Sequence, residues 1–155
     1  MKSKMYLILC LALLLFSLSV PLPAADTDIE LHRECKECGM DRKAYGYSRM
    51  LFEYKGGRSI GTCSLHCLVM ELDGSGAAEV AAIKVADRDS RQLIDAEKAF
   101  WVIGGQKRGV MTPVGKWAFA TEGAAREFIA ANGGKQASWS DVLATTREEL
   151  KQRRR

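Results

Sequence analysis

Two pairs of closely spaced cysteines constrain the fold of this chain more than any other feature of its sequence. Cys35 and Cys38 lie in the segment Cys-Lys-Glu-Cys-Gly-Met, and Cys63 and Cys67 lie in Cys-Ser-Leu-His-Cys. A CxxC segment followed about 24 residues later by a CxxxC segment at a helix start has the form of a treble-clef-like zinc site. Either Cys35 and Cys38 form a disulfide with each other, or both pairs converge on one metal ion and bring two distant segments together.

The first 25 residues have the pattern of an export signal. Two lysines precede an apolar run at residues 5–20, and the small residues Ala24 and Ala25 follow it. The run is shorter than the ~20 residues of a transmembrane helix, so we expect a cleaved signal peptide at residues 1–25 and a periplasmic, extracytoplasmic location. Membrane contact is expected only if the signal stays uncleaved. Cys10 lies inside the apolar run, so the sequence shows no lipoprotein signal.

Cleavage would leave one small domain, residues 26–155. The whole chain has a formal net charge of +4, and the signal removes two lysines from it. The remaining charge is too small to indicate nucleic-acid binding. The basic residues concentrated at 147 and 151–155 close an expected C-terminal helix, where cations favour the helix dipole.

The apolar periodicity predicts an α+β domain with two similar strand-strand-helix-strand units, a mainly antiparallel sheet covered by helices on one side, and a C-terminal helix. The first unit has expected strands at 49–54, 59–62 and 80–86. Its helix is expected to start at residue 63 or 64 and to end at Leu72, before Asp-Gly-Ser-Gly. The second unit has expected strands at 99–103, 116–120 and 135–138, and a helix at 123–132. The final helix is expected from Ser140.

The second cysteine pair faces away from the apolar side of its expected helix. At about 100° per residue, one stripe contains Leu65, Leu68, Val69 and Leu72. Cys63, Cys67 and Met70 share roughly the opposite side, with His66 at its border. Cysteines four apart on a helix have β-carbons about 5–6 Å apart, beyond the usual disulfide range of about 3.5–4.5 Å. These two thiols are therefore expected to face a specific partner.

The residues around the thiols indicate which metal the thiols would bind. Four thiolates suit a closed zinc site, whereas thiolate and thioether together favour Cu(I). Met40 follows the first pair directly, and Met111 lies in a loop between two expected strands. Met50 is expected in the core. Met70 fits equally well in core packing and on the side of the helix that carries the thiols. His32 and His66 are further candidate ligands.

An ordered set of motifs in this chain resembles the nitrous oxide reductase accessory protein family, NosL. The resemblance covers nearly all of residues 26–155. It is carried by Cys35-x-x-Cys38-Gly-Met40, Ile94-Asp95-Ala96, Ala99 to Gly105, Met111, Trp117 to Ala120, Ala124, Phe128 and Asn132-Gly133-Gly134.

This resemblance implies a periplasmic Cu(I) chaperone that takes copper from a donor and delivers it to nitrous oxide reductase or another copper-accepting enzyme. It also implies a fold of two strand-strand-helix-strand units, with Met111 as the loop methionine linked to copper. Two departures are evident. Many family members carry an anchoring lipoprotein cysteine, and the pair Cys63 and Cys67 looks more like the second half of a TRASH or YHS motif.

The function expected from the sequence is metal binding and transfer without enzymatic catalysis. The expected metal ligands are Cys35, Cys38, Met40, Cys63, Cys67 and Met111, with Cu(I) as the metal and zinc as an alternative at the four cysteines. Two other readings remain open. The domain is a protein-binding module stabilised by zinc or disulfides, or it is a thiol–disulfide oxidoreductase that uses its CxxC segment.

Overall fold

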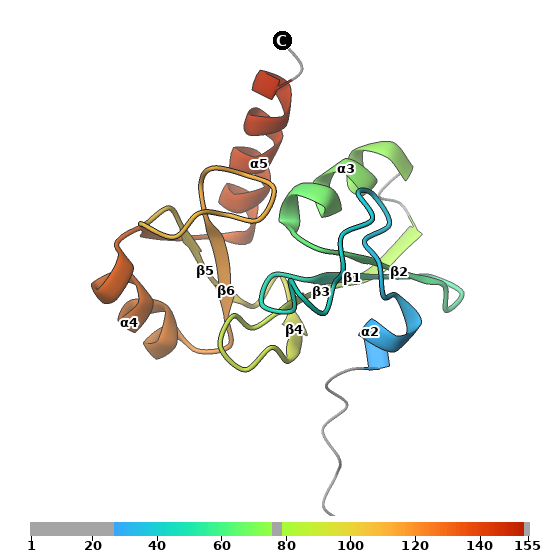
Figure 1. Ribbon diagram of the computed structural model, residues 1–155, viewed down its shortest axis with the longest axis horizontal. Helices are drawn as coiled ribbons and strands as arrows, with labels where there is room; N and C mark the ends of the chain where they lie inside the picture. Colours follow the sequence, from blue (N-terminus) through green and yellow to red (C-terminus); the bar gives the residue numbers. More distant parts are fainter. Residues whose placement is uncertain (1–26, 76–78, 154–155) are drawn as a thin grey trace, which may run out of the picture.

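The structure, a computed structural model, describes residues 27–75 and 79–153. The expected signal peptide, with Cys10 inside it, lies outside the described residues. Among the helices of the described part, none has both the length and the apolar character needed to cross a bilayer. The described chain forms two β-sheets that lie side by side, each with helices packed on it (Figure 1).

The first sheet is formed by the N-terminal half of the chain, in the strand order β2-β1-β3-β4. Neighbouring strands are antiparallel, and their bounds are β1 (Met50–Tyr54), β2 (Ser59–Thr62), β3 (Val80–Ala86) and β4 (Leu93–Asp95). Met50, Phe52 and Tyr54 share one face of β1, because successive side chains of a strand point to opposite faces. That face packs against helix α3 (Leu65–Ser75) in the main core.

The second sheet has the order β6-β5-β7. It contains β5 (Phe100–Ile103), β6 (Lys116–Phe119) and β7 (Lys135–Ala137), with helix α4 (Glu122–Asn132) between β6 and β7. The Thr121 side chain accepts a hydrogen bond from the Ala124 amide and caps the start of α4. Phe128 of α4 packs with Trp117 and Phe119 in a second core.

Helix α5 (Trp139–Arg153) joins the two units. It lies beside α3 in Figure 1 and places Val142 in the main core. Its Glu149 carboxylate pairs with the Lys116 ammonium of β6 at 2.7 Å, and both side chains are largely buried. At the other end of the chain, the short helix α2 (Thr27–Leu31) packs below the first sheet.

The structure confirms the α+β class, the two strand-strand-helix-strand units and the C-terminal helix. It divides the strands between two sheets, whereas the sequence indicated one. Helix α3 starts at Leu65 and continues past its predicted end at Leu72 to Ser75. In this additional part of the helix, Asp73 pairs with Arg147 of α5 (Nε to Oδ1, 3.1 Å). The short elements α2 and β4 were not predicted.

Candidate metal centre

Cys35 and Cys38 lie in a tight turn between α2 and β1. The Cys35 amide donates to the Met40 carbonyl, and the Gly39 amide donates to the Cys35 carbonyl, both at 2.9 Å. Gly39 has a φ of 73°, a left-handed conformation that glycine adopts without steric cost. The residues on either side of the turn are joined by an antiparallel bridge. The turn is therefore closed at its base, with buried Cys35 next to the base and exposed Cys38 further along the turn.

Cys63 follows β2, and Cys67 lies in the first turn of α3. Both side chains are buried in a small cluster with Cys35, separate from the main core that contains Leu65, Leu68 and Val69. The apolar stripe and the thiol side of this segment thus face different surroundings, as the helical wheel predicted. The helix N-terminus contributes partial positive charge, which stabilises thiolates close to it.

The four thiols form one compact group. Their sulfur atoms all lie within 4.8 Å of one another, and the Cys38 sulfur is 3.6 Å from that of Cys63 and 3.7 Å from that of Cys67. The sulfurs of Cys63 and Cys67 are 3.8 Å apart. A tetrahedral ion with metal–sulfur bonds of about 2.3 Å needs sulfur–sulfur edges of about 3.8 Å. All four cysteines are free, and the three separations among Cys38, Cys63 and Cys67 match those of one tetrahedral ion.

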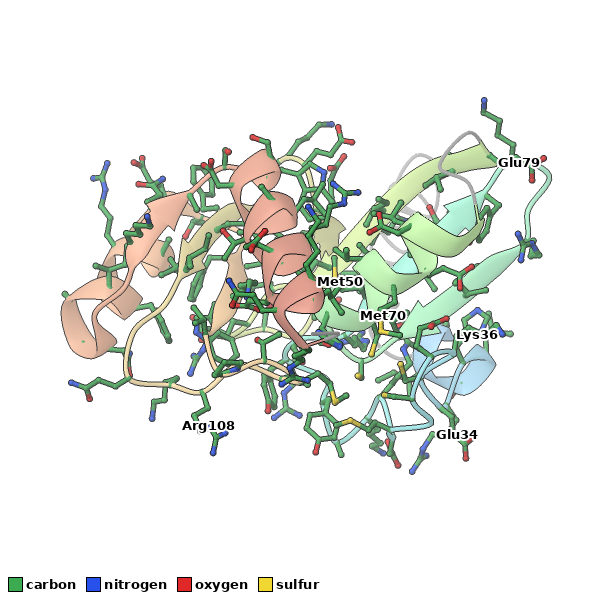
Figure 2. The ribbon with its side chains drawn as sticks, turned by 90° about the horizontal axis from the view of Figure 1, so that it is seen from above. Glu34, Lys36, Met50, Met70, Glu79 and Arg108 are labelled. Atoms are coloured by element: carbon green, nitrogen blue, oxygen red, sulfur yellow. The ribbon has the colours of Figure 1, made fainter. Side chains whose placement is uncertain are left out.

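Three of the four thiols are buried, and one is exposed. Cys35 is 3% exposed and Cys63 and Cys67 are fully buried, whereas Cys38 is exposed. Partly buried side chains pack against the cluster: Met40, Tyr45, Val110 and Met111. Sulfur atoms gather on one side of the molecule in Figure 2. A metal ion or a partner's ligand would reach the cluster at Cys38.

Met111 comes to the thiols from the other unit, in the loop between β5 and β6. Its φ is 63°, which is uncommon for a residue other than glycine; residues strained in this way cluster at functional sites. The ends of the loop are joined by a hydrogen bond from the Gly104 amide to the Gly115 carbonyl at 2.8 Å. The Thr112 hydroxyl donates to the Val114 carbonyl at 2.7 Å. The loop is thus held in the shape that presents Met111.

The thiols perturb one another's protonation. Hydrogen bonds from the Cys63 and Cys67 thiols lower the pKa of Cys35 far below that of a free thiol. The hydrogen bond to Cys35 raises the pKa of Cys63 to about 12, and hydrogen bonds to Cys35 and Cys63 raise that of Cys67. Cys35 is thus the buried thiol of the cluster that gives up its proton most readily. Because metal binding requires thiolates, it would displace the protons that thiols of the cluster still hold.

A buried ionic cluster fixes the cysteine turn to the sheet. The Asp28 carboxylate pairs with the guanidinium groups of Arg42 at 2.7 Å and Arg49 at 2.9 Å, and both arginines are almost fully buried. Arg42 also donates to the backbone carbonyls of Asp28, His32, Met50 and Thr62. This cluster was not predicted from the sequence, because arginine and aspartate are mostly exposed in folded proteins. In the sequence, the one indication of this ionic cluster is that Arg42 follows the first cysteine motif closely, two residues after Met40.

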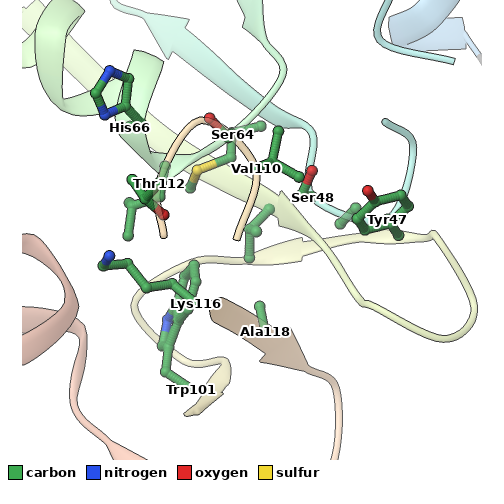
Figure 3. Close-up of a pocket in the computed structure, with 13 residues that line it drawn as sticks. Tyr47, Ser48, Ser64, His66, Trp101, Val110, Thr112, Lys116 and Ala118 are labelled. Atoms are coloured by element: carbon green, nitrogen blue, oxygen red, sulfur yellow. The ribbon is translucent and has the colours of Figure 1, made fainter. Parts of the chain in front are cut away.

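The other three candidate ligands, His32, His66 and Met70, are not among the described residues that form or pack on the thiol cluster. The His32 Nε2 atom is 2.8 Å from the Ser59 hydroxyl. His66 is buried beside a cavity of about 20 Å³ between the two units, which Lys116 also lines (Figure 3). Burial lowers the pKa of both histidines. Met70 is half-buried on α3 and is not among the described residues that pack on the thiol cluster.

Comparison with known families decides where this chain belongs. The model of the NosL family matches residues 26–146. The chain belongs to the NosL family. No curated protein gives a significant match. Among solved structures, the crystal structure of the copper chaperone NosL from Shewanella denitrificans matches with a TM-score of 0.54 and 24% identity, over 69% of this chain and 87% of that one. At this identity the match shows a shared fold.

The NosL resemblance drawn from the sequence is thus confirmed. In the sequence, the first cysteine pair and Met111 are among the residues that carried this resemblance. The second pair, which resembles a TRASH or YHS motif, supplies the other two thiols of the same compact group. What looked like two separate features of the sequence is one cluster in the structure of this NosL-family chain.

Proposed function

We propose that this NosL-family protein binds Cu(I) and transfers it to a copper-accepting enzyme. The observation that supports this most is that the side chains of Met40 and Met111 pack on a group of four thiols. Sets of thiolate and thioether ligands select Cu(I) over harder metal ions. The related crystal structure is named as that of a copper chaperone, which supports the same metal here.

In the proposed transfer, copper keeps its +1 charge and only its ligands change. The buried thiols of Cys35, Cys63 and Cys67 retain the ion, while exposed Cys38 is the first to yield its place to a partner's donor. Met111 offers a neutral thioether that binds without giving up a proton, so it can hold copper while thiols exchange. No covalent bond of a substrate is made or broken, and the protein acts as a carrier rather than an enzyme.

The proposed recipient is nitrous oxide reductase or another extracytoplasmic copper enzyme, and a separate protein supplies the copper. The NosL membership of the chain supports this recipient. The expected signal at residues 1–25 would bring the protein to the periplasm, where such a recipient would be met.

Anaerobic titration of the reduced protein with Cu(I), against a competing chelator, tests the proposal. We expect tight binding that weakens by about tenfold or more, or ~1.4 kcal/mol, in Cys63→Ser and Cys67→Ser. Met50→Leu is the matched control, because Met50 is fully buried in the main core. An affinity no tighter than that of an ordinary dithiol, in the unmodified protein, would contradict the proposal.

A structural zinc site is a second candidate function, favoured by the sulfur separations of 3.6–3.8 Å. In that case zinc should copurify at about one equivalent and its removal should unfold the domain. Zinc that resists displacement by Cu(I), together with a Met111→Leu variant indistinguishable from the parent, would favour this reading over copper transfer.

A further inference from the structure

A cleft lined by cations and aromatic rings lies next to the thiol cluster. Its volume is about 480 Å³. Its walls carry the rings of Tyr47 and Trp117 and four cations, Arg88, Arg91, Lys107 and Arg108. The proposed metal chemistry does not use this cleft, and of its lining residues only Trp117 belongs to a motif identified in the sequence.

The cleft has an excess of positive charge. Its one carboxylate is Asp89, which pairs with Arg88 (Nη1 to Oδ1, 2.7 Å). Arg91, Lys107 and Arg108 are exposed, and within residues 27–75 and 79–153 none of them has a carboxylate partner. A concave surface of one charge sign attracts ligands of the opposite sign and speeds their association. The cleft is therefore suited to a negatively charged ligand.

The turn that carries two of these cations is held in place by Asp87. This carboxylate accepts hydrogen bonds from the amides of Ser90 and Ala120, each at 2.9 Å. The Arg88 amide donates to the Ala118 carbonyl of β6 at 2.8 Å. The positions of Arg88 and Arg91 are thus fixed by the fold before any ligand arrives, which lowers the entropic cost of binding.

The aromatic walls give the cleft ring surface beside its cations. The rings of Tyr47 and Trp117 lie 6.1 Å apart. Trp117 is 5% exposed, and its indole Nε1 has no hydrogen-bond partner among the described residues. Buried indole N–H groups usually find an acceptor. In this protein the Nε1 atom is buried against Gly115, so the aromatic wall offers a bound segment ring surface rather than this donor.

Two loops line both the cleft and the thiol cluster. In the first, Tyr45 packs on the thiols while Tyr47 lines the cleft, and their rings lie 6.4 Å apart. In the second, Arg108 lines the cleft, and Met111 packs on the thiols three residues later. Figure 2 shows Arg108 extending outward from this loop. A molecule bound in the cleft would contact the loop that presents Met111.

We propose that this cleft docks an acidic segment, rich in aspartate and glutamate, of the protein with which copper is exchanged. The proposal rests on the proposed function, because it assumes a protein partner. Guanidinium groups bind carboxylates in bidentate pairs, and tyrosine, tryptophan and arginine are enriched where protein interfaces are strongest. The cleft is far larger than an inorganic anion needs, and a flat anionic bilayer would not reach the buried ring of Trp117.

A blocked hexaglutamate peptide serves as the probe, and its affinity is measured by calorimetry at low and at raised salt. The test variant is the triple charge reversal Arg91→Glu, Lys107→Glu and Arg108→Glu. Its matched control is Lys55→Glu, Lys135→Glu and Lys151→Glu, which makes the same charge change at exposed sites elsewhere. We expect the test variant to bind the peptide at least about tenfold more weakly, while the control binds like the parent protein at raised salt. Cu(I) affinity, measured by chelator competition, should stay unchanged in both.

Equal peptide affinity in the two triple variants would overturn the proposal. So would a parent protein that binds inorganic phosphate, or vesicles of anionic phospholipid, through the same three residues but ignores the peptide. The two proposals fail separately. Absent Cu(I) binding in the parent protein contradicts the carrier function, whereas intact Cu(I) binding without peptide binding contradicts the docking cleft alone.

Discussion

At the scale of single residues, Met111 links backbone geometry to metal chemistry. It holds a left-handed φ of 63° in the loop of the second unit and packs on thiols of the first. Leucine matches methionine in size and apolar character but has no sulfur. A leucine at this position therefore separates the role of the thioether from that of the loop.

We predict that Met111→Leu weakens Cu(I) binding by about tenfold, or ~1.4 kcal/mol, and leaves Zn(II) binding unchanged, because thioethers select the softer ion. Chelator competition with each metal measures both affinities. Met50→Leu should change neither. If Cu(I) and Zn(II) affinities fall together in Met111→Leu, the shape of the loop matters and the sulfur does not.

Asp28 gives a second prediction at this scale. Burial alone would raise its pKa, but the hydrogen bonds and charges of Arg49 and Arg42 outweigh burial and hold the pKa below its ordinary value of 3.8. A lowered folded-state pKa stabilises the fold above the unfolded-state pKa, and this stabilisation is lost as the pH falls through the folded-state value. We expect the free energy of unfolding of the metal-free protein, from urea titrations, to decrease below about pH 4.

The matched variant is Asp28→Asn, which leaves two buried guanidinium groups without their carboxylate. It should lower the free energy of unfolding at neutral pH by about 3–5 kcal/mol. It should also lose the part of the acid dependence that Asp28 contributes. An identical decrease with pH in parent and variant would assign the acid sensitivity to other carboxylates.

At the scale of elements, strand β2 packs closely against the cysteine turn at Gly61. A Cβ atom at Gly61 would overlap the guanidinium of Arg42, whereas one at Gly74 of α3 would meet open space. The Gly61 carbonyl also accepts a hydrogen bond from the Lys36 amide, between the first two thiols, at 2.9 Å. Strand β2 thus supports the turn in two ways: its backbone accepts a hydrogen bond, and the absence of a side chain at Gly61 leaves room for the Arg42 guanidinium.

We predict opposite effects for the two glycine substitutions. Gly61→Ala should lower the free energy of unfolding by about 1–3 kcal/mol, because Arg42 must move from a buried position. Gly74→Ala should raise it by up to about 1 kcal/mol, because alanine favours the helix. Urea unfolding of both variants measures the difference. A Gly61→Ala protein as stable as its parent would show that Arg42 can move aside at no cost.

Some features of these elements could be predicted from the sequence, and others could not. Strand β3 has the predicted bounds, and Cys67 of α3 faces away from Leu65 and Leu68 as expected, because alternation and helical spacing are local signals. Elements α2 and β4, of five and three residues, were missed. The buried arginines and the cationic cleft depend on segments far apart in the chain, and charged residues are normally assigned to the surface.

At the scale of the whole molecule, the candidate site draws on both units. The thiols come from the first unit, Met111 from the second, and the buried pair of Lys116 and Glu149 ties the second unit to α5. A metal bound at this junction should therefore stabilise the entire domain. Ligands that bind only the folded state raise its stability by mass action.

We predict that Cu(I) buffered at about 100 times its dissociation constant adds ~2.7 kcal/mol to the free energy of unfolding. Anaerobic thermal melts with and without buffered Cu(I) measure the change. The double variant Cys35→Ser and Cys67→Ser should show none of it, whereas Met50→Leu should show all of it. A bound metal that leaves the melting temperature unchanged would mean that the unfolded chain binds it equally well.

The positions of the donors along the chain also set the order in which they come together. All four thiols lie within residues 35–67, and short loops close at little entropic cost and form early. A chain that emerges with its N-terminus first frees these cysteines well before residue 111. We expect the thiol cluster to assemble while the second half of the protein is still unstructured. Copper met at that moment would be held by the cysteines and Met40, and Met111 would join it only when the second unit folds.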